Sequence, residues 1–160
     1  MSSSKPEPQI KALVVCLGNI CRSPMGEAVL KDIATKRGMD VHVDSCGTAG
    51  YHVGEEPDER CVECSRLVLQ SLARQISTSD FVRFTHILAA DENNLRHLQS
   101  MKPSNATAEV RLWGSYHDNK AIPDPYYGGL NGFEKVYQQC VRLSHAFLDN
   151  VVGKAETNEV

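Results

Sequence analysis

The feature that most constrains the fold of this chain is an apolar run followed at once by a short turn and a helix. The run IKALVVCL at residues 10–17 is continuous and rich in β-branched side chains. Such a run is typical of a strand buried on both faces, as in a parallel sheet that helices cover on both sides. The sequence therefore predicts an α/β fold with this strand at the centre of its sheet.

Strands and helices alternate along the rest of the chain. We expect Ser23 to cap the first helix, with Pro24 at its first position and Gly38 beyond its end. The pattern predicts further strands at 40–45, 84–90 and 108–114, helices at 58–72, 91–101 and 133–151, and loops at 46–58 and 115–131. This alternation indicates one domain with a four-stranded parallel, doubly wound (Rossmann-like) sheet and helices on both faces.

The chain is expected to form one domain at 9–152 between flexible tails at 1–8 and 153–160. Its formal net charge of −3 provides no basic surface for nucleic acid. No apolar run approaches the roughly 20 residues that cross a bilayer, so no membrane partner is expected. The first residues, MSSSKPEPQ, are polar and do not form a signal peptide. We therefore expect a cytoplasmic protein.

Six cysteines, at positions 16, 21, 46, 61, 64 and 140, are expected to be reduced thiols because no secretion signal precedes them. Cys61 and Cys64 form a C-x-x-C pair, but no second Cys or His pair lies at zinc-finger spacing. The six histidines are scattered without ligand spacing. The sequence therefore predicts no metal site.

Cys16 ends the first apolar run, at the edge where doubly wound folds bind ligands. It is the only one of the six cysteines with an arginine, Arg22, at the sixth position after it. A strand, loop and helix in this order form a nest of backbone N–H groups that binds anions, with the positive end of the helix behind it. Gly18 and Asn19 tolerate the positive φ angles that such a loop needs. Neither a Walker motif nor G-x-G-x-x-G is present.

This setting favours a nucleophilic thiolate at Cys16. Amide dipoles, a helix N-terminus and the charge of Arg22 all stabilise the negative sulfur. The planar guanidinium of Arg22 is suited to hold two phosphoryl oxygens. The hydroxyl of Ser23 is expected near the sulfur, where it would donate a hydrogen bond to the thiolate.

A cysteine that attacks phosphorus needs a proton donor for the departing oxygen. Asp124 is the best candidate, because it lies between Pro123 and Pro125, after the fourth strand and at the same sheet edge as Cys16. The prolines restrict the backbone and hold the carboxyl in place. A simple turn is the alternative interpretation of this segment. Tyr126 and Tyr127 favour the wall of a slot for an aromatic substrate.

VVCLGNICRSPMGEAVL together with DPYYGG resembles the low-molecular-weight protein tyrosine phosphatases, and the similarity extends over about residues 10–150. It implies hydrolysis of phosphotyrosine proteins and small aryl phosphates through a phosphocysteine, without metal or cofactor. Inorganic phosphate or another oxyanion would bind in the loop, and the protein would be mostly monomeric with weak dimerisation. The implied catalytic roles are Cys16 as nucleophile, Arg22 as phosphate clamp, Ser23 as thiolate partner, and Asp124 as general acid and then base. The implied phosphate-binding loop consists of Leu17, Gly18, Asn19, Ile20 and Cys21, and it would be supported by Asn19 and Ser45. The residues implied to flank the substrate ring are Tyr51, Tyr126 and Tyr127.

The sequence departs from the family pattern at a few positions. Gly26 stands where the family commonly has Ala, and Ser71 or Leu72 where relatives often have a loop-bracing His. Cys21 has two open interpretations. It is packing under the loop, or, as the resemblance implies, a resolving thiol that protects oxidised Cys16 by a disulfide.

Two alternative functions remain open at this stage. One is an arsenate reductase on the same scaffold, in which Cys61 and Cys64 would serve a thiol relay. The other is a non-catalytic module that binds phosphate or phosphotyrosine. The presence of Cys16, Arg22 and Asp124 together favours the phosphatase over both.

Overall fold

One parallel sheet organises the molecule. The computed structural model describes residues 9–65, 67, 71–125 and 129–158. The sheet has the order β2-β1-β3-β4, and its strands are β1 (Ile10–Cys16), β2 (Val41–Gly47), β3 (His86–Ala89) and β4 (Glu109–Leu112). All the neighbours pair in parallel, and β1 has a partner on each side. The predicted fold class and the inner position of the first strand are confirmed.

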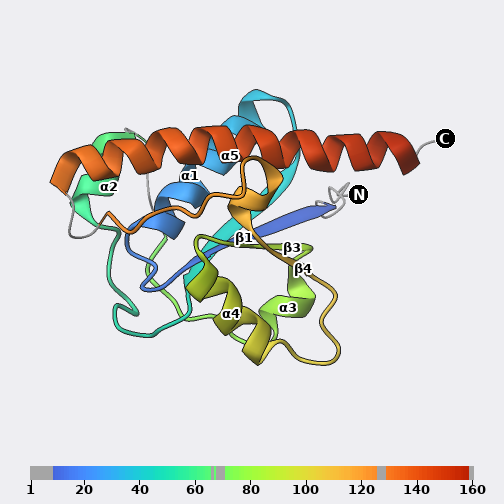
Figure 1. Cartoon of the computed structure of the whole chain (residues 1–160), viewed down its shortest axis with the longest axis horizontal. Coiled ribbons are helices and arrows are strands. Elements are labelled where there is room, and N and C mark those ends of the chain that lie inside the picture. The colour runs from blue at the N-terminus through green and yellow to red at the C-terminus, as the bar shows by residue number, and fades with distance from the viewer. Residues whose placement is uncertain (1–8, 66, 68–70, 126–128, 159–160) are drawn as a thin grey trace, which may run out of the picture.

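Helices cover both faces of this sheet (Figure 1). On one face lie α1 (Arg22–Lys36), α2 (Glu59–Ser65) and the long α5 (Gly129–Asn158). On the other face lie α3 (Asp80–Arg83) and α4 (Glu92–Met101). This arrangement follows from parallel pairing, because each crossover between parallel strands carries a helix back over the sheet.

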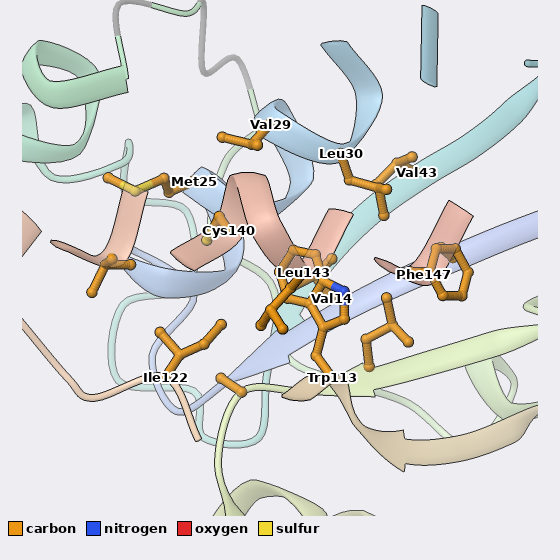
Figure 2. Close-up of a cluster of buried hydrophobic side chains, with 14 of the residues drawn as sticks. Val14, Met25, Val29, Leu30, Val43, Trp113, Ile122, Cys140, Leu143 and Phe147 are labelled. Atoms are coloured by element: carbon orange, nitrogen blue, oxygen red, sulfur yellow. The ribbon is translucent and has the colours of Figure 1, made fainter. Parts of the chain in front are cut away.

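The side chains of β1 alternate between two separate cores. Val14 packs with α1 and α5, whereas Leu13 and Val15 pack in the core that contains residues of α3 and α4. Figure 2 shows the first core, in which Val14 lies among side chains of α1, β2, α5 and the segment after β4, namely Met25, Val29, Leu30, Val43, Trp113, Ile122, Cys140, Leu143 and Phe147. Burial on both faces explains why the run at residues 10–17 is apolar throughout.

The first helix begins differently from the prediction. Arg22 is its first residue and Cys21 is its N-cap, without a side-chain capping hydrogen bond. Ser23 is therefore not the cap, because its hydroxyl binds the sulfur of Cys16 and the amide of Asn19 instead. Pro24 still lies in the first turn, where a missing N–H is tolerated.

Other boundaries also differ. The helix expected at 58–72 ends at Ser65, and Ser71 and Leu72 are not helical. Just after them, the backbone of Ala73 makes hydrogen bonds to Gly54 and Glu55 instead of bonds within a helix. The short α3 was not predicted, and a 3₁₀ helix, Trp113–Tyr116, replaces the end of the fourth predicted strand.

At the C-terminal end, α5 continues to Asn158, past the domain boundary expected at residue 152. Residues 1–8, predicted to be a tail, lie outside the described residues. No helix within the described ranges is long and apolar enough to span a bilayer.

Candidate active site

A cavity of about 380 Å³ opens where β1 ends and α1 begins. Its position at the carboxyl edge of an inner strand is the expected location of a ligand site in this fold. The lining residues are Cys16, Leu17, Gly18, Ile20, Cys21, Arg22, Tyr51, His52 and Asp124. All of them except His52 were predicted from the sequence, so segments far apart in the chain meet at one site.

The sulfur of Cys16 receives two hydrogen bonds. The backbone N–H of Asn19 donates to Sγ at 3.3 Å, and the hydroxyl of Ser23 lies 3.0 Å from it. Ser23 Oγ accepts from Asn19 Nδ2 at 2.8 Å, which leaves its own proton available for donation to a Cys16 thiolate. These two contacts place polar groups around a buried sulfur at the edge of the cavity.

The loop at residues 17–21, predicted from the sequence to bind phosphate, has its carbonyl groups held on its outer side. The oxygens of Cys16, Leu17 and Ile20 accept hydrogen bonds from the backbone N–H groups of Thr48, Ala49 and Asp58 at 2.8–3.0 Å. In a trans peptide the N–H points away from the C=O. The N–H groups of the peptides that follow these residues therefore face the inside of the loop, where they form an anion-binding nest.

Asn19 holds this loop in shape. Its φ of 59° is the left-handed conformation that Asn tolerates, whereas Gly18 does not have a positive φ. Glycine at position 18 leaves room for the ring of His52, which would lie 2.9 Å from a Cβ there. The side chain of Asn19 donates to Ser23 and Ser45 and accepts from the N–H of Arg74 at 2.9 Å.

A half-buried carboxylate extends this network. Glu27 accepts hydrogen bonds from Ser45 Oγ at 2.5 Å and from Ser71 Oγ at 2.7 Å. Burial raises the pKa of Glu27, and the two serine hydrogen bonds oppose this effect. Ser71, one of the two positions where relatives often have a bracing histidine, thus contacts the chain Glu27, Ser45 and Asn19 behind the loop.

Arg22 is fixed from behind the cavity. Its Nη1 donates to Asp91 Oδ2 at 2.7 Å and to the carbonyl oxygen of Ile122 at 3.0 Å, and its side chain is 4% exposed. Asp91 follows β3 and caps α4 through its other oxygen, which accepts from the N–H of Asn94. The guanidinium therefore has a set orientation at the cavity wall before any ligand binds.

Asp124 lines the same cavity as the loop at residues 17–21 and lies on the segment after the 3₁₀ helix. Its Oδ2 is 3.8 Å from Nη2 of Arg22, and its side chain is 42% exposed. The segment is anchored two residues earlier, where Ile122 donates its N–H to Ala90 and accepts from Arg22. The carboxyl of Asp124 therefore reaches the cavity from an anchored backbone while it stays accessible to water.

The rim of the cavity is partly aromatic. Tyr51 is 76% exposed and lines the opening together with His52. The Nδ1 of His52 pairs with the carboxylate of Glu55, which sets the orientation of the ring. Tyr126 and Tyr127, predicted to flank the substrate, lie outside the described residues.

Sequence reasoning missed three of these residues. Asp91 and Glu27 each contact the site through a partner on another element, and His52 lies on a loop with no regular period. For Asp91 a local signal was present, because Asp91 and Asn94 form a capping box that marks a fixed carboxylate at a strand end. Among the described residues, no group of three or more His, Cys, Asp and Glu is placed to hold a metal ion.

Comparisons with known proteins show which family this chain is similar to. The family model described as low molecular weight phosphotyrosine protein phosphatase matches residues 11–157. The protein of that name from Schizosaccharomyces pombe is 44% identical over 151 residues, which cover 89% of this chain and 97% of the relative. The crystal structure of Primo-1 has a TM-score of 0.84 at 40% identity and covers 88% of this chain and 97% of its own. The structure of DARP, a drosophila arginine phosphatase, has a TM-score of 0.82 at 38% identity, with 89% and 98% covered.

Proposed function

This chain belongs to the low molecular weight phosphotyrosine protein phosphatase family, and on that premise we propose that it hydrolyses phosphotyrosine and small aryl phosphates through a phosphocysteine on Cys16. The observation that carries this proposal is the sulfur of Cys16, which accepts hydrogen bonds from Asn19 and Ser23 at a cavity that Arg22 and Asp124 also line. The site thus combines a stabilised nucleophile, a fixed cation and a carboxyl group.

In the first step the thiolate attacks the phosphorus of the bound monoester. Arg22 and the inward N–H groups of the loop bind the phosphoryl oxygens and stabilise the charge that spreads over them in the transition state. The protonated carboxyl of Asp124 donates its proton to the departing phenolate oxygen. The bond between phosphorus and that oxygen breaks, and the phosphoryl group stays on the sulfur.

In the second step water cleaves the phosphocysteine. Asp124, now a carboxylate, accepts a proton from the attacking water, whose oxygen forms the new bond to phosphorus. The Cys16 sulfur leaves as a thiolate, which the hydrogen bonds from Ser23 and Asn19 stabilise. Inorganic phosphate then dissociates and frees the loop for another substrate or for a competing oxyanion. The charge of Arg22 and the loop dipoles perform the electrostatic role in both steps, so we propose a reaction without metal or cofactor.

The walls of the cavity support an aryl ester as the substrate. Leu17, Ile20 and Tyr51 present apolar and aromatic surface around the phosphate position, and Leu17 is 44% exposed. Such surface stacks on a phenyl ring, whereas these three side chains offer little hydrogen bonding to the polar guanidinium of phosphoarginine. We therefore expect phosphotyrosine to be preferred over phosphoarginine, the substrate class that the name of the drosophila relative suggests.

The proposal is tested by hydrolysis of p-nitrophenyl phosphate, phosphotyrosine peptide and phosphoarginine by the wild type and Cys16→Ser, each with and without chelator. We expect aryl phosphatase activity that survives chelation and is absent in Cys16→Ser, which keeps its affinity for vanadate. A non-catalytic module would show no turnover in the wild type, and an arsenate reductase would consume thiols with arsenate but not cleave aryl phosphates. Neither alternative is favoured by the relatives. We also place this activity in the cytoplasm, in a mostly monomeric protein.

A further inference from the structure

Cys61 lies directly beneath the phosphate-binding loop. It projects from α2, is 0% exposed, and its Sγ is 3.4 Å from the carbonyl oxygen of Cys21 and 3.8 Å from that of Ile20. The largest cause of the raised pKa of the Cys61 thiol is a side-chain hydrogen bond with Cys21, ahead of burial. The mechanism described above uses neither of these sulfurs, and nothing in it explains why they are adjacent.

Three thiols are therefore arranged in a row from the cavity into the core. Cys16 and Cys21 both line the cavity, and Cys61 lies behind Cys21. The fourth thiol near this row, Cys140 on α5, is fully buried in the same core, and Cys46 faces the other core. Within the described ranges, Cys61 differs from Cys46 and Cys140 in having hydrogen bonds to the backbone carbonyls of the loop.

We propose that Cys21 and Cys61 form a disulfide when peroxide oxidises the enzyme, and that this exchange returns Cys16 to its active thiolate. The inference rests on the proposed function, because it takes Cys16 to be the reactive thiolate. It assigns Cys61 as a second resolving thiol, one step further from the cavity than Cys21. Peroxide needs access to Cys16 alone, so the burial of Cys61 is no obstacle.

The chemistry balances over three steps. Hydrogen peroxide transfers one oxygen to the Cys16 thiolate, which becomes a sulfenic acid, and leaves as hydroxide. The Cys21 sulfur attacks that of Cys16, forms a disulfide and releases a second hydroxide, which takes up the Cys21 proton as water. The Cys61 sulfur then attacks Cys21, loses its proton to solvent, and expels the Cys16 thiolate. One peroxide is reduced to water, and two thiols are oxidised to one disulfide.

The direction of the last step follows from the surroundings of the two end sulfurs. Cys16 is a good leaving group because Asn19 N–H and Ser23 O–H stabilise its thiolate. In the part of the chain that the structure describes, the hydrogen bonds of Cys61 Sγ run to carbonyl oxygens, which do not stabilise a thiolate. The contact with Cys21 and burial raise its pKa, so its thiolate is scarce and the exchange is slow. We therefore expect the Cys16–Cys21 disulfide to accumulate first and then to convert to Cys21–Cys61.

The test follows disulfides and activity in the same sample. Reduced wild type is assayed with p-nitrophenyl phosphate, oxidised briefly with hydrogen peroxide, treated with catalase and incubated without reductant. Samples are alkylated at intervals, digested with trypsin and mapped by mass spectrometry. Cys16 and Cys21 share one tryptic peptide, whereas Cys61 lies in another, CVECSR, so the proposed disulfide appears as a cross-link between two peptides.

The matched variants are Cys61→Ser and Cys64→Ser, which alter the two cysteines of the same tryptic peptide. Each is compared with its own reduced activity. We expect the wild type and Cys64→Ser to form the cross-link and to regain most of their activity. Cys61→Ser should regain less than about a tenth until dithiothreitol is added, since its first disulfide has no resolving thiol.

The proposal is overturned if the wild type forms no Cys21–Cys61 cross-link, or if Cys61→Ser recovers as well as the wild type without reductant. A cross-link between the same two peptides that persists in Cys61→Ser and is lost in Cys64→Ser would assign the disulfide to Cys64 and would also contradict the proposal. If Cys61→Ser does not fold, the peptide map of the wild type decides the question alone. A failure of the proposed function is seen separately, as absent phosphatase activity in the reduced wild type.

Discussion

Arg22 Nη1 donates a 2.7 Å hydrogen bond to Asp91 Oδ2, and this contact ties the predicted phosphate clamp to the start of α4. The same carboxylate accepts the N–H of Asn94 through its other oxygen, at 2.8 Å. Because the capping interaction fixes the carboxylate, the guanidinium that binds it is also fixed. Two contacts thus orient the guanidinium of Arg22. One is the carboxylate of Asp91, between β3 and α4, and the other is the carbonyl oxygen of Ile122.

Replacement of Asp91 is expected to impair catalysis more than stability. In Asp91→Asn the side-chain oxygen still caps α4, but the charge that orients Arg22 is lost. Misplacement of the guanidinium by about 1 Å should lower kcat/KM roughly 100-fold. Steady-state kinetics and thermal unfolding of Asp91→Asn and of the control Glu92→Gln, one residue further on, will measure this. Equal kinetics in both variants would show that Asp91 does not orient the clamp.

Asp124→Ala tests the general acid. Without the carboxyl, the departing oxygen leaves as an unprotonated anion, which affects poor leaving groups most. We expect kcat to fall about 10²- to 10⁴-fold for phosphotyrosine and phenyl phosphate, and much less for aryl phosphates with acidic phenols. A series of substituted phenyl phosphates gives the dependence on leaving-group pKa. The same fractional loss for all esters would rule out proton donation by Asp124.

The fold and the reactive centre are encoded locally. An unbroken apolar run predicts the buried strand β1, and the topology of the fold places Cys16 at the end of that strand. The spacing to Arg22 and the prolines around Asp124 are equally local signals, and all three residues line the same cavity.

The supports of the centre are not encoded locally. Asp91 meets Arg22 across 69 positions of sequence, and Ser71 meets Glu27 across 44. Such pairs depend on the crossing of elements, which no single segment specifies. For Ser23 the local signal was misleading. The sequence around it fits a helix cap, but in the structure its hydroxyl contacts the sulfur of Cys16.

Gly26 departs from the family pattern for a packing reason. A Cβ at this position would lie 2.7 Å from the ring of Trp113 and 3.0 Å from Val14. Gly26→Ala should therefore lower the free energy of unfolding by about 1–3 kcal/mol despite the better helix propensity of Ala. Urea unfolding measures the change. The double variant Gly26→Ala/Trp113→Phe should lose less than the two single losses combined, because the smaller ring leaves room for the methyl group. Stabilisation by Gly26→Ala would contradict the steric explanation.

The raised pKa of Glu27 has a definite consequence for stability. Burial is its largest cause, and the folded protein therefore binds the proton of Glu27 more tightly than the unfolded chain does. A raised carboxyl pKa contributes stability that is fully present below the unfolded value, near 4.5, and is lost as pH rises through the folded value. Glutamine resembles the protonated form of the side chain and does not titrate.

We expect Glu27→Gln to gain stability relative to the wild type as pH rises from about 4 to about 7. Urea unfolding of both proteins across this range gives the difference in free energy of unfolding at each pH, in which the titration of all other groups cancels. The exposed Glu92→Gln is the control for the loss of a carboxylate outside this network. At each pH the phosphatase activity of Glu27→Gln reports whether Ser45 and Ser71 still hold the loop. A difference that falls with rising pH would mean that the ionised carboxylate is favoured in the folded state, with the serine hydrogen bonds outweighing burial.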